Sequence, residues 1–136
     1  METVVLQVRT GDREQVVDLT PRCSAWLGQI GAVDGLLNVF VPHATAGVAV
    51  LETGAGSDDD LLAALGVLLP PSSGWQHRHG SPGHGRDHVL PALVAPHATL
   101  PVQAGTLALG TWQSVCLVDT NVDNPVREVR LSFLAG

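Results

Sequence analysis

Four of the six histidines in this chain lie in a single stretch, and their spacing is the first indication of chemistry. They are His77, His79, His84 and His88. A neutral imidazole is the commonest protein ligand for zinc and similar cations, and a catalytic zinc takes about three protein ligands while one position stays open. Glycines between the histidines also fit an exposed loop of solvated side chains. The stretch therefore predicts either a metal site or a solvated histidine tract.

A second group of polar residues lies within or next to two expected strands. His43 comes after residues 36–41, and Glu52 lies within residues 47–53. A carboxylate beside an imidazole can orient a metal ligand or act as a general base. Glu52 can equally face solvent at a sheet edge, because burial of an unpaired carboxylate is costly. Arg127, after an Asn-Pro turn, either pairs with a surface carboxylate or holds an anionic ligand with its planar guanidinium.

The composition limits the classes of protein to which the chain can belong. Its 136 residues, 45% of them apolar, predict one domain spanning residues 1–136. No apolar run approaches the ~18 residues of a membrane span, and the N-terminus lacks a basic region, so we expect a cytoplasmic protein without a membrane partner. The net charge of −6 and seven scattered arginines argue against nucleic-acid binding. Two distant cysteines, Cys23 and Cys116, are expected to be buried and unpaired.

Alternating strand and helix patterns predict an α+β fold with mostly antiparallel strands. Turn residues Gly11 and Asp12 predict a hairpin between residues 4–9 and 14–19. Helices are expected from Thr20 to about Gly31, from Ser57 to the proline pair at Pro70, and over about residues 87–94. The remaining expected strands are residues 36–41, 47–53, 99–102, 106–111, 113–119 and 126–133.

Several motifs together resemble the YjbQ family, small bacterial and archaeal proteins often labelled secondary thiamine-phosphate synthases. The likeness runs from about Val4 to Gly136 and is strongest in Leu109-Gly-Thr-Trp-Gln113 with its upstream histidine and proline. The matching residues are His43-Ala-Thr-Ala46, Glu52, Trp75-Gln-His77, His88, Leu100-Pro-Val102, Gly105, Leu109-Gly-Thr-Trp-Gln113 and Arg127.

The resemblance implies a mainly antiparallel β-sheet sandwich with two to three short helices, assembled as a homotrimer. It also implies a metal or anion pocket near subunit contacts, with His43, His77 and His88 as metal ligands. Glu52, Asp60 and Arg127 are the implied catalytic residues, Asp60 as the acidic residue of the second helix. His79 and His84 match no family histidine, so we expect both to be more exposed than the other three.

The implied activity is a weak condensation of a hydroxymethylpyrimidine diphosphate with a thiazole phosphate, which releases pyrophosphate. The partner would be a small phosphorylated substrate. Histidine ligands favour zinc or nickel, whereas magnesium would fit with a diphosphate substrate. Leu51 and the turn Ala55-Gly56 replace a family amide and carboxylate, which would weaken coordination.

Two alternative functions remain open from the sequence. One is a metal-assisted hydrolase of a small phosphorylated or cyclic substrate, with Glu52 as base. The other is a trimeric binding module without catalysis, in which the histidines hold a structural or adventitious ion.

Overall fold

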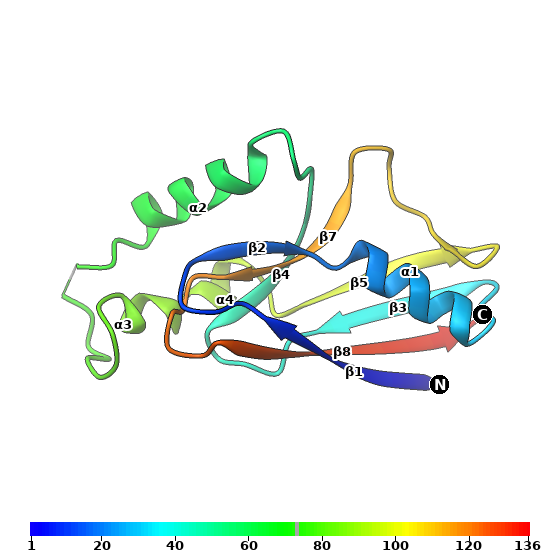
Figure 1. Cartoon of the computed structure of the whole chain (residues 1–136), viewed down its shortest axis with the longest axis horizontal. Coiled ribbons are helices and arrows are strands. Elements are labelled where there is room, and N and C mark those ends of the chain that lie inside the picture. The colour runs from blue at the N-terminus through cyan, green and yellow to red at the C-terminus, as the bar shows by residue number, and fades with distance from the viewer. Residues whose placement is uncertain (73) are drawn as a thin grey trace.

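The computed structural model describes residues 1–72 and 74–136, and it confirms an α+β fold (Figure 1). All neighbouring strands pair antiparallel. In chain order the elements are β1 (Glu2–Arg9), β2 (Gln15–Asp18), α1 (Thr20–Gln29), β3 (Gly35–Phe40), β4 (Ala46–Leu51), α2 (Ser57–Leu68), α3 (His84–Asp87), α4 (Leu90–Leu93), β5 (His97–Gln103), β6 (Thr106–Leu107), β7 (Ser114–Asp119) and β8 (Val126–Ala135).

The strands form two sheets that share one core. A five-stranded sheet has the order β1-β8-β3-β5-β6, and a three-stranded sheet has the order β2-β7-β4. Side chains from both sheets meet in the same cluster, among them Val39 and Leu131 from the larger sheet and Val48 and Leu117 from the smaller one. Such face-to-face burial of apolar side chains is the arrangement of a sandwich. The expected antiparallel sandwich is therefore confirmed.

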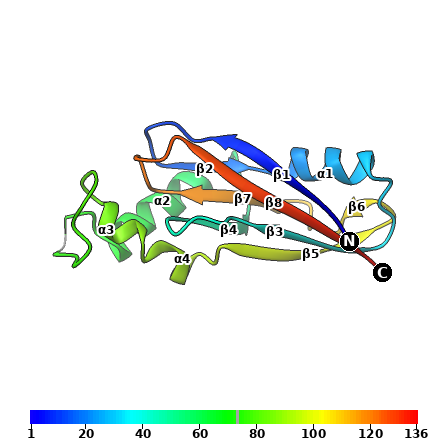
Figure 2. The ribbon, with the colours of Figure 1, turned by 90° about the horizontal axis from the view of Figure 1, so that it is seen from below.

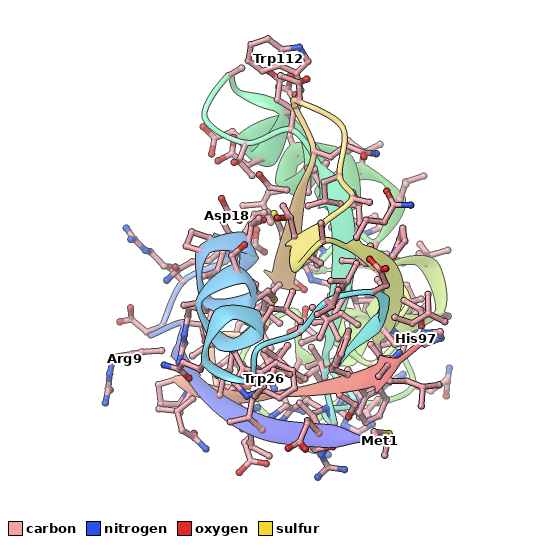
Figure 3. All side chains as sticks on the ribbon, turned by 90° about the vertical axis from the view of Figure 1, so that its right-hand side faces the viewer. Met1, Arg9, Asp18, Trp26, His97 and Trp112 are labelled. Atoms are coloured by element: carbon pink, nitrogen blue, oxygen red, sulfur yellow. The ribbon has the colours of Figure 1, made fainter. Side chains whose placement is uncertain are left out.

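The helices lie at the two ends of the sandwich. Figures 1 and 2 show α2 and α3 at one end, while α1 and both chain termini lie at the other. Helix α1 buries Cys23, Trp26 and Leu27 against the core, with Trp26 pointing toward β1 (Figure 3). Both cysteines are buried and free, as expected. Burial raises the pKa of the Cys23 thiol to about 12, so the group is a small apolar core residue.

Two expectations about local structure are wrong. β1 and β2 do not form a hairpin, because β1 pairs with β8 and β2 pairs with β7. The backbone amides of Thr10 and Gly11 instead bond the carbonyl of Pro125, which directs the chain from one sheet to the other. The helix expected over residues 87–94 is two separate turns, since Pro91 has no amide hydrogen and its ring excludes the carbonyl four residues earlier.

Other boundaries differ only at their ends. α1 and α2 cover the residues expected for them, except that Thr20 is the first helical residue and Leu19 precedes it at the N-cap. Strand β6 is shorter than the expected residues 106–111. No helix among residues 1–72 and 74–136 has the length and hydropathy needed to cross a bilayer.

A charged residue occupies one inward position of the longest strand, β8. Side chains alternate across a strand, and Arg127 shares its buried face with Val129 and Leu131. Its Nε donates to Oδ2 of Asp119 at 2.7 Å, and its Nη2 donates to Oδ1 at 2.9 Å and to Oγ1 of Thr45 at 2.9 Å. Arg127 and Asp119 are 1% and 0% exposed. This pair satisfies the two charges that the strand pattern places inside the sandwich.

Replacement of Arg127 by leucine should therefore lower the free energy of unfolding by about 3–5 kcal/mol, because it leaves the Asp119 carboxylate buried without a cation. Urea denaturation followed by circular dichroism measures the change. Arg9→Leu is the control, since Arg9 is exposed and points away from the molecule (Figure 3), and we expect a change within ~0.5 kcal/mol. Equal effects of the two substitutions would contradict a structural role for the buried pair.

Candidate functional site

The predicted site lies at the end of the sandwich opposite the chain termini. We call residues 74–88 the histidine loop; it joins the end of α2 to α4 and includes α3 (Figure 2). A pocket of about 380 Å³ lies against this loop. Its lining includes Trp75, His77, Arg78, His79 and His84. Imidazoles and one guanidinium thus face a shared space large enough for a small ligand.

A buried arginine and its neighbouring carboxylate hold the loop in place. Arg86 is 3% exposed and donates from Nε to Oδ1 of Asp87 at 2.8 Å and from Nη1 to the carbonyl of Leu69 at 3.1 Å. It also forms an ion pair with Glu14. Asp87 accepts a second bond from Thr120 Oγ1 at 2.6 Å. The loop is consequently bonded to the end of α2, to the segment before β2 and to the segment after β7.

Four imidazoles pack together on this support. The ring centroid of His77 lies 4.1 Å from that of His79 and 4.0 Å from that of His88, and the rings of His84 and His88 are 4.9 Å apart. One ring nitrogen from each of His77, His79 and His84 lies within 4.8 Å of the others. Nε2 of His84 is 3.1 Å from Nε2 of His88. We call these four residues the histidine cluster.

One pair of nitrogens in the histidine cluster has a spacing that suits ligands of a shared metal ion. Two nitrogens bound at ~2.0–2.1 Å to one tetrahedral zinc lie ~3.3 Å apart, close to the 3.1 Å that separates His84 Nε2 and His88 Nε2. Desolvation, and then the neighbouring imidazoles, lower the pKa of His77 and of His88 below the usual value. His77 and His88 therefore favour the neutral imidazole, which is the form that binds metals.

His84 departs from the sequence expectation. Its side chain is only 11% exposed, so the expectation that it would be one of the more exposed histidines is wrong. His79 is exposed, but so are His77 and His88, so the expected contrast with these two is not seen. His84 and His88 are four residues apart, a spacing that places side chains on one face of a helical turn. This spacing is the sequence feature from which the place of His84 beside His88 could have been predicted. Asp123 and Asn121, which contact His84, were not predicted, since they lie 37–39 residues away in a turn.

The other predicted site residues lie outside this pocket in the single chain. Glu52 directly follows β4 and is exposed, and Asp60 is exposed in the first turn of α2. The residues that line the pocket come from positions 71–85, so neither carboxylate contributes to its wall. Arg127 is bound by Asp119 and Thr45 in the core. Its predicted contact with an anionic ligand is not among the bonds that it makes in this chain.

His43 bonds the backbone of β8. Its Nε2 accepts a hydrogen bond from the amide of Glu128 at 2.9 Å, and desolvation followed by the charge of Arg127 lowers its pKa. Accepting this bond requires an unprotonated Nε2, which agrees with the lowered pKa. His43 is not one of the three residues whose ligand atoms meet in the histidine cluster. The prediction that His43 shares one pocket with His77 and His88 includes neighbouring subunits, and it stays a prediction.

The structure defines the class of protein, which is a sandwich of antiparallel sheets with a histidine cluster at one end. The family model described as "UPF0047 protein YjbQ-like" matches residues 4–136. The chain therefore belongs to the YjbQ-like UPF0047 family, as its motifs predicted.

Relatives and solved structures agree with this assignment. The chain is 58% identical to the UPF0047 protein Rv2556c of Mycobacterium tuberculosis over 136 residues, which is 100% of each chain. It is 30% identical to the UPF0047 protein MJ1081 of Methanocaldococcus jannaschii over 89% of this chain and 85% of that protein. A crystal structure of the hypothetical protein APE1520 from Aeropyrum pernix K1 has a TM-score of 0.89 and 36% identity, covering 100% of both chains. These relatives support the family and the fold.

One glycine lets the histidine loop fold back on itself. A Cβ at Gly85 would overlap the carbonyl oxygen of His77 and lie 2.8 Å from Cβ of Trp75. We expect Gly85→Ala to lower the free energy of unfolding by about 1–3 kcal/mol through overpacking. Gly66→Ala is the control, because a Cβ at this position in α2 meets nothing within 4 Å. Alanine is the better helix former there and should stabilise by about 0.5–1 kcal/mol.

Thermal and urea unfolding of the two variants measure these opposite changes. Stabilisation by Gly85→Ala would show that residues 75–77 do not pack against α3 as described.

Proposed function

We propose that the histidine cluster binds a divalent transition metal, with zinc or nickel favoured over magnesium, and that the protein acts on a small phosphorylated substrate in the adjoining pocket. The observation that carries this proposal is the gathering of four imidazoles, with the Nε2 atoms of His84 and His88 3.1 Å apart, beside a pocket of about 380 Å³. Nitrogen donors suit zinc and nickel, whereas magnesium prefers oxygen ligands.

The proposed ligands are His77, His84 and His88, which leave one position open for water or substrate. His77 and His88 are also the two loop histidines that the family resemblance implies. The third implied ligand, His43, already accepts a hydrogen bond from the amide of Glu128 through Nε2 within its own chain, so we do not include it among the ligands proposed from this chain. A metal held in this way supplies a Lewis acid for a phosphoryl oxygen or lowers the pKa of a water molecule.

Arg78 is the residue of this chain that we assign to the substrate phosphate. It is exposed, it lines the pocket, and its Nε donates to the carbonyl of Trp75 at 3.1 Å. That bond fixes the guanidinium plane and leaves the Nη groups for a paired contact with phosphate oxygens. Arg127 is less suited to this role, because Asp119 and Thr45 already occupy its donors inside the core.

Two reactions fit this site. Thiamine-phosphate formation is the activity that the family resemblance implies, and it requires neutralisation of a leaving pyrophosphate. Metal-assisted hydrolysis is the second candidate, and the exposure of His77, His79 and His88 favours it, because water reaches an open site readily. Arg78 is the one arginine in the pocket lining described, which also suits a single phosphate better than a diphosphate.

Metal binding should be tested on protein purified without a histidine tag. We expect about one zinc or nickel per chain by elemental analysis, and removal of the metal by a chelator should abolish turnover. His77→Ala and His88→Ala should weaken zinc binding by ~100-fold or more in calorimetry, since each removes a ligand, whereas loss of an outer partner costs ~10–100-fold. His97→Ala is the control, because His97 is exposed at the start of β5 and is not one of the histidines whose ligand atoms lie together.

Assays with both thiamine precursors and with a panel of phosphate esters then separate the two reactions. Turnover that survives both chelation and His88→Ala would contradict the proposed mechanism, as would metal binding that the His77 and His88 substitutions leave unchanged.

We also propose that the chain assembles as a homotrimer. The outward face of the five-stranded sheet supports this, since Leu36 and Leu134 are direct partners on β3 and β8 and are 47% and 55% exposed. Adjacent exposed apolar side chains are commonly covered by a partner. Light scattering should give about three times the chain mass of 14.2 kDa, and a Leu36→Ser, Leu134→Ser double variant should shift the mass toward one chain. A wild-type mass of one chain at micromolar concentration would refute the trimer.

A further inference from the structure

The two ring nitrogens of His84 have different surroundings. Nδ1 lies 2.7 Å from Oδ2 of Asp123 and 3.2 Å from Nδ2 of Asn121. Nε2 lies 3.1 Å from Nε2 of His88. Only one nitrogen of a neutral imidazole carries a hydrogen, so the neighbours of Nδ1 decide which nitrogen has the lone pair available to a metal.

Asp123 and Asn121 make opposite demands on Nδ1. An ionised carboxylate only accepts hydrogen bonds, so Asp123 requires a hydrogen on Nδ1. The amide nitrogen of Asn121 only donates, so it would require a lone pair there. The contact with Asp123 is shorter by 0.5 Å, the difference between 3.2 and 2.7 Å, and a charged acceptor makes the stronger bond.

The amide of Asn121 has other partners, which removes the conflict. Its Nδ2 donates to Oδ2 of Asp87 at 3.1 Å. Its Oδ1 accepts from the backbone amide of Asp123 at 3.0 Å and from Nδ2 of Asn124 at 2.9 Å. These three bonds fix the orientation of the amide and leave the ring nitrogen to Asp123.

The carboxylate of Asp123 is itself anchored on the histidine loop. Its Oδ2 accepts from the backbone amide of Ser81 at 3.1 Å, and its Oδ1 accepts from the Ser81 hydroxyl. These bonds, together with that of His84, hold the pKa of Asp123 down at about 2. The two bonds from Ser81 thus fix Asp123 relative to residues 81–84 independently of its contact with the His84 ring.

We propose that Asp123 is a positioning residue that accepts the Nδ1 hydrogen of His84 and so presents the Nε2 lone pair of His84 to the ion shared with His88. The inference rests on the proposed metal site and adds to it a carboxylate that neither the sequence motifs nor the family resemblance indicated. A carboxylate or carbonyl that accepts the second ring hydrogen is a recurrent way to orient a metal-binding histidine. The surroundings of His84, together with its closeness to His88, would then favour its role as a metal ligand.

The direct test is the protonation pattern of the His84 ring in the metal-free protein. Nitrogen-15 NMR correlations of the imidazole rings, with His84 assigned by its loss in His84→Gln, distinguish hydrogen on Nδ1 from hydrogen on Nε2. We expect wild-type His84 to carry its hydrogen on Nδ1, and Asp123→Ala to shift the ring toward the Nε2 form. Asp123→Asn, which keeps the side-chain shape, is the second variant in case the alanine variant folds poorly. Asp59→Asn is the control for loss of one negative charge, because Asp59 is exposed on α2.

Zinc titration of the same proteins separates this inference from the proposed function. We expect Asp123→Ala and Asp123→Asn to weaken zinc binding by ~10–100-fold and Asp59→Asn to leave it unchanged. Zinc affinity and an Nδ1 hydrogen that are both unaltered in the Asp123 variants would overturn the positioning role while the metal site stands. A wild-type protein that binds no zinc but whose His84 tautomer depends on Asp123 would defeat the metal proposal and keep the role of Asp123 in orienting the ring.

Discussion

The buried guanidinium of Arg86 is the interaction on which the histidine loop depends. It bonds the carbonyl that ends α2, the carboxylate of Asp87 and the side chain of Glu14 before β2. Asp87 in turn bonds Thr120 and Asn121 after β7. A loop rich in glycine loses much conformational entropy when it becomes ordered, so a cluster of four rings needs such an anchor. One network thus supports both the backbone of the loop and the residues that contact His84.

The sequence predicted the fold well where local patterns decide it. Helices α1 and α2 follow from the proline at the start of one and from the aspartates at the start of the other, and β8 follows from its alternating side chains. The hairpin prediction failed because alternation specifies a half-buried strand and leaves its partner open. The partner of β1 is β8, and the partner of β2 is β7. Both partners lie about a hundred residues or more further along the chain. Pairing at that distance is decided by the whole sandwich.

The candidate site was predictable in its residue types and less so in its members. The density of histidines identified the loop, but the family resemblance alone favoured His77 and His88 and set His84 aside. The structure brings His84 into the cluster because Asp123 and Asn121 reach it from a turn 37–39 residues away. Arg127 is the opposite example. From the sequence, its position after a turn left both surface contacts and ligand contacts open, whereas the alternation of side chains along β8 places it in the core beside Asp119. Partners distant in sequence decided both outcomes.

Anomalous diffraction from crystals grown with zinc tests the central claim most directly. The account predicts one anomalous peak at about full occupancy within ~2.0–2.1 Å of Nε2 of His84 and of His88, with His77 completing the ligand set. It also predicts that the carboxylate of Asp123 still contacts Nδ1 of His84 when the ion is bound. A peak located elsewhere on the chain, or zinc-soaked crystals in which the four rings keep no ion, would contradict the account.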